Sequence, residues 1–152
     1  MPALKALAFP VDVLDSVVAG VFEKMFFVET AAVPSSCPAE DLHWTRLDFD
    51  GADCGWCAVA LSDGTGAALA ADFLGVDFDE ADHSSVLYLL QELANIVCGA
   101  FLSRWQPGSL FHLSSPEAFE GCARDAELLR CYRIREGVLH VALYHGCPTG
   151  SR

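Results

Sequence analysis

The stretch SSVLYLLQELANIVCGAFLSR, from Ser84 to Arg104, carries the longest periodic pattern of apolar residues in the chain. Its apolar side chains recur at intervals of three and four residues, which predicts a long central helix with one buried face. Neighbouring segments are therefore expected to pack against this helix. The face expected in the core consists of Val86, Leu89, Leu90, Leu93, Ile96, Val97, Ala100 and Phe101.

A second set of residues lies on the other side of the predicted helix. At about 100° per residue, Tyr88, Glu92, Asn95 and Gly99 fall within roughly 60° of one another, about 130° from the middle of the buried stripe. A carboxylate and an amide one turn apart can contact one partner together. Gly99 costs the helix roughly 1 kcal/mol relative to alanine, and on this face it allows another protein to approach closely.

The segments before the central helix predict another helix and a hairpin. Periodic apolar residues and β-rich runs define the elements, and proline and glycine separate them. In chain order we expect a helix over 13–28, a surface loop over 30–41, antiparallel strands over 44–50 and 55–62, a turn over 63–66, and a short helix over 67–74 that ends at Gly75.

The segments around and after the central helix predict a second hairpin. The acidic stretch 77–82 is expected to form a solvated start to the central helix. We then expect a strand over 110–113, a short irregular or helical piece over 116–123, strands over 127–134 and 138–144 joined by a turn with Gly137 in the left-handed conformation, and a mobile tail over 146–152.

Length and composition predict one domain over residues 1–152. The chain is 53% hydrophobic, which is ample for one core. Neither internal repeats nor linkers separate the elements. We expect an α/β domain of the α+β type, in which long helices pack on an antiparallel sheet.

Charge and hydropathy exclude several classes of partner. A net charge of −12 would repel nucleic acid and anionic lipid. No uninterrupted apolar stretch approaches the ~18 residues of a membrane span, and no signal-peptide pattern is apparent at the amino terminus. We therefore expect a cytoplasmic protein that binds neither nucleic acid nor membrane.

The cysteines, histidines, acidic residues and serines outside this helix face form no pattern that predicts a metal, cofactor or nucleophilic site. The seven cysteines are expected to be reduced, many of them as small core residues. Cys54 and Cys57 would point to opposite faces of a strand, without a second C-x-x-C motif. Weak candidates also include His145 with Cys147 for a metal, Asp77, Asp79 and Asp82 for calcium, and His83 with Ser84 or Ser85 for hydrolysis; none has a complete motif.

The segment ELANIVCG, residues 92–99, resembles the E-x-x-N signature of the CheC/CheX chemotaxis phosphatase family, which is followed by an apolar pair and a glycine. Further similarities span most of the chain in the expected order. The first helix has no E-x-x-N, so the chain resembles CheX, with one site per subunit, more than CheC, with two. The other similar segments are 22–25, 47–51, 67–75 and 114–116.

This resemblance implies a CheC/CheX-like fold and a phosphatase that hydrolyses the phosphoaspartate of a CheY-like response regulator. Asn95 would orient the attacking water, and Glu92 would form an ion pair with the regulator's lysine. Tyr88 and Gly99 would contact the partner. The regulator would supply Mg²⁺, so this chain would bind no cofactor itself, and a homodimer is implied.

Two other interpretations stay open. Tyr88 occupies a position where the family usually has Asp or Ser, which favours a non-catalytic CheX-like binding module. The exposed helix could alternatively serve a scaffold that oligomerises. An exposed glutamate and asparagine on an amphipathic helix are, moreover, more often ordinary solvated residues than catalytic ones.

Overall fold

The computed structural model describes residues 9–34, 42–119, 126–135 and 137–146. Within these residues, one helix and three strands precede a helical block, and four strands follow it. The elements are α1 (Val11–Phe26), β1 (Thr30–Val33), β2 (Leu42–Gly51), β3 (Gly55–Ser62), α2 (Asp63–Leu74), the 3-10 helix η1 (Phe78–Glu80), α3 (His83–Trp105), β4 (Phe111–Leu113), β5 (Glu117–Phe119), β6 (Leu128–Ile134) and β7 (Gly137–His145).

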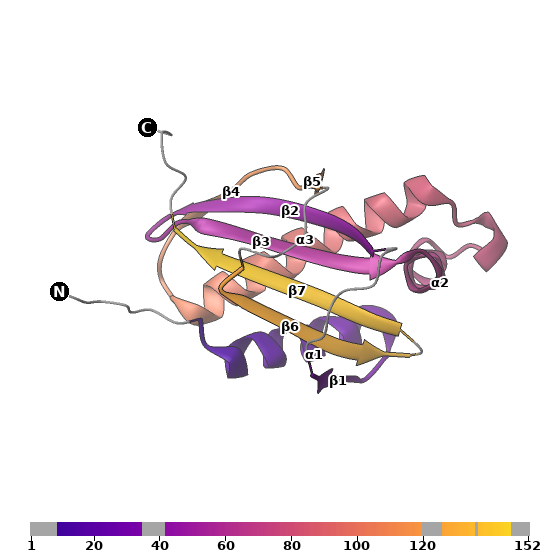
Figure 1. Ribbon diagram of the computed structural model, residues 1–152, viewed down its shortest axis with the longest axis horizontal. Helices are drawn as coiled ribbons and strands as arrows, with labels where there is room; N and C mark the ends of the chain where they lie inside the picture. The colour runs from indigo at the N-terminus through magenta and orange to yellow at the C-terminus, as the bar shows by residue number, and fades with distance from the viewer. Residues whose placement is uncertain (1–8, 35–41, 120–125, 136, 147–152) are drawn as a thin grey trace.

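The strands form one sheet in the order β1-β6-β7-β3-β2-β4, and β5 also pairs with β2. All of these pairings are antiparallel. The long helix α3 crosses behind the sheet in Figure 1, and one apolar cluster joins α1, α2, α3 and the sheet. The predicted α+β class, with helices packed on an antiparallel sheet, is therefore confirmed.

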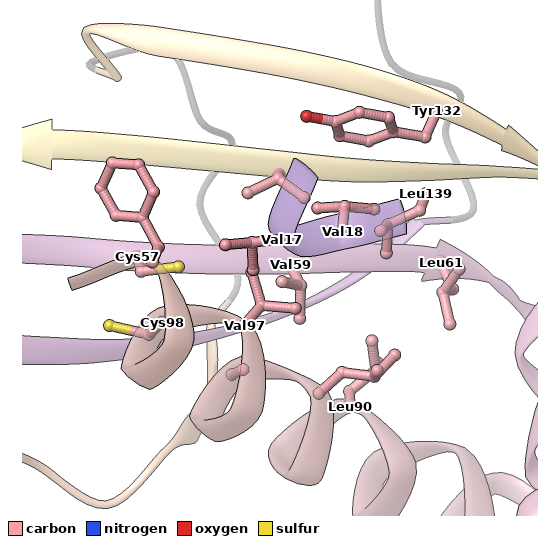
Figure 2. Packing of buried hydrophobic residues seen from close by; sticks show 14 of the residues in the cluster. Val17, Val18, Cys57, Val59, Leu61, Leu90, Val97, Cys98, Tyr132 and Leu139 are labelled. Carbon is pink, nitrogen blue, oxygen red and sulfur yellow. The ribbon is translucent and has the colours of Figure 1, made fainter. Parts of the chain in front are cut away.

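The core side of α3 is wider than the apolar pattern predicts. Ile96 and Ala100, on one edge of the predicted face, are only half-buried. The buried side of α3 extends instead toward Ala94, Cys98 and Leu102. In Figure 2, Leu90 and Val97 point from α3 toward Val59 and Leu61 of β3. The buried residues of α3 are Val86, Leu89, Leu90, Leu93, Ala94, Val97, Cys98, Phe101 and Leu102.

The central strand β3 is buried on both faces. Cys57, Val59 and Leu61 belong to the cluster under the helices, whereas Trp56 and Ala58 belong to a second cluster on the opposite face of the sheet. A strand buried on both faces needs no alternation of polar and apolar residues, so its near-continuous apolar sequence has a structural reason.

The cysteines that the structure describes are of two kinds. Cys57, Cys98 and Cys131 are free and buried, which confirms for these three the prediction of reduced core residues. The sulfur atoms of Cys57 and Cys98 lie on facing elements in Figure 2, and the hydrogen bond between the two thiols, together with burial, raises the pKa of the Cys98 thiol. Cys54 is disulfide-bonded, so the prediction of a reduced thiol is wrong at this position.

The boundaries of two predicted elements are wrong on the amino-terminal side. Residues 30–33, predicted as part of a loop, form the strand β1 on β6, and residues 35–41 lie outside the described residues. α2 begins at Asp63 instead of 67, because the Ser62 side chain accepts a hydrogen bond from the Thr65 backbone N–H and caps the helix.

Three predictions change on the carboxyl-terminal side. Residues 117–119, predicted as irregular or helical, form the strand β5, and residues 120–123 lie outside the described residues. In the β6–β7 turn it is Arg135, with φ of 51°, that adopts the left-handed conformation, and not Gly137. Gly146, predicted to begin a mobile tail, donates a backbone hydrogen bond to Cys54; residues 147–152 lie outside the described part of the chain.

Among the described residues, α3 is the one helix whose length and hydropathy would suffice to cross a bilayer. Half of its most apolar window is buried inside the domain, as in the core helix of a compact protein. This is weak evidence for a membrane span.

A polar network attaches α1 to β6. The Asp15 carboxylate accepts hydrogen bonds from Nε and Nη2 of Arg130, at 2.9 and 2.7 Å, and from the Tyr132 hydroxyl, at 2.6 Å. The Arg130 guanidinium, helped by the Tyr132 hydroxyl, holds the pKa of Asp15 below its usual value, although burial acts in the opposite direction. The carboxylate therefore stabilises the fold in its ionised form.

We expect the substitution Asp15→Asn to lower the free energy of unfolding at pH 7 by about 1–2 kcal/mol, because the three charge-assisted hydrogen bonds from Arg130 and Tyr132 to the carboxylate are weakened. The pKa of Asp15 is lower in the folded state than in the unfolded state, where it is about 3.9. The stability that this carboxylate contributes is therefore fully present above the unfolded-state pKa, and it is lost as the pH falls through the folded-state pKa. The difference between wild type and variant in urea unfolding should therefore shrink below about pH 4. A difference independent of pH would contradict this assignment.

Candidate functional site

The four residues singled out by the sequence lie along one stripe of α3. Asn95 is exposed, Tyr88 has 47% of its surface exposed, and Glu92 and Gly99 are half-buried. The middle of this stripe lies about 160° around the helix axis from the middle of the buried residues of α3. The stripe therefore faces away from the sheet.

The acid and the amide make no polar contact inside the described part of the chain. No hydrogen bond or ion pair of a described residue involves the side chain of Glu92 or Asn95, whereas neighbouring Gln91 donates to the backbone oxygen of Pro116 at 3.4 Å. The carboxylate oxygens of Glu92 and the amide of Asn95 are therefore available to a partner.

Both ends of α3 are fixed by side-chain contacts. Asp82 is the N-cap, where its carboxylate accepts a hydrogen bond from the Ser85 backbone N–H at 3.0 Å. This backbone hydrogen bond and the Ser85 hydroxyl lower the pKa of Asp82. At the other end, Arg104 donates to the Ser16 hydroxyl of α1 at 3.1 Å. The stripe thus lies on a helix whose position is set at both ends.

Apolar side chains flank the acid–amide pair. The Tyr88 ring, one turn before Glu92, lies 6.1 Å from the Phe73 ring of α2. On the other side of the pair, the position of a β-carbon on Gly99 lies 4.0 Å from Leu113 of β4, which is itself partly exposed. Two polar groups with apolar neighbours have the composition of a protein-docking surface.

The chemistry open to this surface is limited by its groups. A carboxylate can accept hydrogen bonds or pair with a cation, and an amide can both donate and accept. The stripe holds no histidine, cysteine or serine, and its acid–amide pair is suited to binding and to the orientation of a water molecule.

The weaker candidates stay without support in the structure. Asp77 and Glu80 cap η1, and Asp82 caps α3, so this acidic stretch serves as the start of helices. Nε2 of His145 lies 2.6 Å from Oδ1 of Asp53, and Cys147 lies outside the described residues. Ser85 contacts Asp82, not His83.

One group of polar residues was missed by sequence reasoning. His43, Asp63 and His83 place their ligand atoms within 4.8 Å of one another. Each is separated from the next by 20 residues in the sequence, which matches no short metal-binding motif. Only the pairing of β2 with β3 and the packing of α2 on α3 could have identified this group.

Comparison with known proteins shows a shared fold without detectable sequence similarity. No protein-family model matches the chain, and no curated protein matches it in sequence. Three solved structures illustrate the structural similarity. The chemotaxis protein CheX from Vibrio vulnificus superimposes with a TM-score of 0.71 at 14% identity, over 93% of this chain and 100% of that chain.

The second is CheX in the CheX-CheY-BeF3-Mg²⁺ complex from Borrelia burgdorferi, with a TM-score of 0.68 at 14% identity, over 92% of this chain and 99% of that chain. FliY from Thermotoga maritima has a TM-score of 0.59 at 10% identity, over 88% of this chain and 84% of that chain. The fold expected from the resemblance is therefore confirmed: the chain has the CheC/CheX fold.

The open position at Gly99 predicts a stabilising substitution. Gly99→Ala should raise the free energy of unfolding by about 0.5–1 kcal/mol, because alanine favours a helix and its methyl group meets nothing closer than 4.0 Å. Gly66→Ala is the matched control on α2, where a β-carbon would lie 2.7 Å from Val86, and it should destabilise the protein. Chemical denaturation measures both, and a destabilising Gly99→Ala would show that this face is not open.

Proposed function

We propose that this chain, which has the CheC/CheX fold, is a phosphatase that hydrolyses the phosphoaspartate of a CheY-like response regulator. The single observation that carries the proposal is the pair formed by Glu92 and Asn95. These side chains lie one turn apart on the outward stripe of α3, and neither has a polar partner among the residues that the structure describes. An acid and an amide in this arrangement match the E-x-x-N signature to which the segment is similar.

The solved CheX-CheY-BeF3-Mg²⁺ complex supports the choice of partner. That CheX protein has the same fold, and its partner is CheY. By analogy of fold, a CheY-like receiver domain is the partner class that we propose for this chain.

Most of the electrostatic stabilisation of the reaction would come from the regulator. Its phosphoryl group sits on an aspartate beside Mg²⁺, which neutralises charge on the transferring group. Water attacks phosphorus, the bond between phosphorus and the aspartate oxygen breaks, and inorganic phosphate leaves while the aspartate is regenerated. This chain then needs to supply only position and orientation.

Asn95 would orient the attacking water. Its amide can accept a hydrogen bond from the water and donate one to a phosphoryl oxygen, which would hold the water in line with phosphorus. The exposure of Asn95 and its position on a helix fixed at both ends support this role.

Glu92 would orient the helix against the regulator through an ion pair with the regulator's lysine. Glu92 as a whole residue is half-buried, so its side chain has fewer accessible conformations than that of a fully exposed glutamate and less entropy to lose on pairing. Tyr88 and Gly99 would lie against the regulator on either side of the pair.

The second candidate is a CheX-like module that binds the regulator without hydrolysis. Tyr88 favours this function, because an aromatic residue with 47% of its surface exposed stands where the family usually has Asp or Ser. Exposed tyrosine is common in binding surfaces. The homodimer, the cytoplasmic location and a Mg²⁺ ion supplied only by the partner stay predictions that accompany either function.

Removing the amide of Asn95 tests the catalytic role. We expect Asn95→Ala to slow the chain's acceleration of dephosphorylation by about 100-fold or more, because the water loses its orientation. The decay of purified, phosphorylated receiver domains, followed with and without the chain, measures this. Binding of the receiver should be largely retained.

The matched control is Ser103→Ala, which removes an exposed polar group from the same helix. It should leave the decay rate unchanged. If the wild-type chain binds the phosphorylated receiver but does not speed its decay, the binding module is the correct function. Wild-type activity in Asn95→Ala would refute the orientation of water by this residue.

Neutralising Glu92 tests the docking role. We expect Glu92→Gln to weaken binding of the receiver by about tenfold, or about 1.4 kcal/mol, and to reduce its salt dependence, because one interfacial ion pair is lost. Glu23→Gln, an exposed glutamate on α1, makes the same change in net charge and should bind normally. Titration calorimetry at two salt concentrations distinguishes a local pair from a general charge effect.

A further inference from the structure

Two histidines and a carboxylate converge at the start of α3. Nε2 of His43 lies 2.6 Å from Oδ1 of Asp63, and the rings of His43 and His83 have centroids 5.2 Å apart. One ligand atom from each of the three residues lies within 4.8 Å of the others. Among the described residues, this is the one group of three or more potential metal ligands that the structure brings together.

Three separate elements hold these ligands in place. His43 lies near the start of β2, where it pairs in register with Leu61 of β3. Asp63 is the first residue of α2 and follows β3 directly, while His83 is the first residue of α3. The backbone positions of the ligands are therefore set by the sheet and by the packing of the two helices.

The spacing is close to that of a metal site. Bonds of about 2.0–2.1 Å to Zn²⁺ in a tetrahedral arrangement place neighbouring ligand atoms about 3.3 Å apart. The 2.6 Å contact between His43 and Asp63 is shorter than this, and the 4.8 Å limit is longer. Rotation of the exposed side chains of Asp63 and His83 can close the difference without moving the backbone.

The surroundings leave room for a fourth ligand. A cavity of about 410 Å³ is lined by both histidines, together with Trp44 and Leu87. No lysine or arginine is among the described residues that line it, so no fixed positive charge competes with a cation. The net charge of the chain, −12, also favours cation binding.

From these contacts we infer that His43, Asp63 and His83 form a binding site for a divalent transition-metal ion, with Zn²⁺ as the metal that fits best. Two imidazole nitrogens and one carboxylate oxygen suit zinc, whereas calcium and magnesium prefer oxygen ligands alone. Three protein ligands leave the fourth position to water or to a small ligand in the cavity. This site is separate from the acid–amide pair, and the inference does not rest on the phosphatase proposal.

Metal binding should join β2, α2 and α3 at one point and stabilise the fold. We expect the purified chain to bind one Zn²⁺ in competition with a chromophoric chelator. A free Zn²⁺ concentration 100-fold above the dissociation constant should lower the unfolding equilibrium constant about 100-fold, which raises the thermal midpoint. His83→Ala and Asp63→Asn should each remove most of this shift.

The matched control is His112→Ala, an exposed histidine on β4 outside the group, which should bind Zn²⁺ like the wild type. Substitution with Co²⁺ checks the ligand type, because thiolate ligands give a charge-transfer band that imidazole and carboxylate ligands do not. The inference would be overturned by any of three results. These are unchanged Zn²⁺ binding in both the His83→Ala and the Asp63→Asn variants, a thiolate band in the Co²⁺ spectrum, and the absence of saturable binding by the wild type. In the last case His43 and Asp63 would be only a hydrogen-bonded pair.

Discussion

The packing of α3 against the sheet is the constraint on which the rest of the structure depends. Leu90, Leu93 and Val97 are fully or almost fully buried, and each contributes roughly 1.5–3 kcal/mol by leaving water. Once this side of the helix is committed to the core, rotation about the helix axis would expose these side chains. The opposite side must then face outward, so the direction of Glu92 and Asn95 follows from contacts that neither residue makes. A rigid helix of this kind can present two polar groups with a defined spacing.

The sequence predicts the elements with strong apolar periodicity and misses those that depend on distant partners. The helix around residues 84–104 is found because its pattern extends over many turns. β1 is missed because its four residues have no alternation and are mostly exposed at their centre; only β6 makes them a strand. The start of α2 is missed because Gly64 and Gly66 indicate a turn by composition, whereas Gly66 packs directly against Val86 of α3. Burial of Ala94 and Cys98 was likewise not predictable, because small residues count little in a periodic pattern although neighbouring elements enclose them.

The candidate site also has one property that the sequence predicts, the placement of its residues, and one that it does not, their function. Glu92 and Asn95 could be placed on one face from their spacing alone, because helix geometry is local. Their function could not be derived in this way, since the fold occurs both in CheX and in a FliY protein, and one fold can serve different functions. Identities of 10–14% show that many different side chains can build this core. Hydrolysis is therefore inferred from the chemistry of the outward pair, because the fold alone does not specify an activity.

The helix dipoles oppose the binding of a cation by His43, Asp63 and His83, and the size of this effect can be compared with that of metal coordination. Asp63 and His83 are the first residues of two helices, and the positive end of each helix dipole disfavours a nearby cation by about 0.3–1 kcal/mol. Zinc coordination in zinc-finger peptides, which supply four ligands, is worth about 10–16 kcal/mol, so the dipole effect is small on that scale, and the Asp63 carboxylate offsets part of the helix field. The dipoles can thus reduce the affinity for zinc without preventing binding. His83 precedes Glu92 by nine residues, or about 13.5 Å along the helix. A metal at the start of α3 would therefore act on the outward pair only by fixing the helix that carries it.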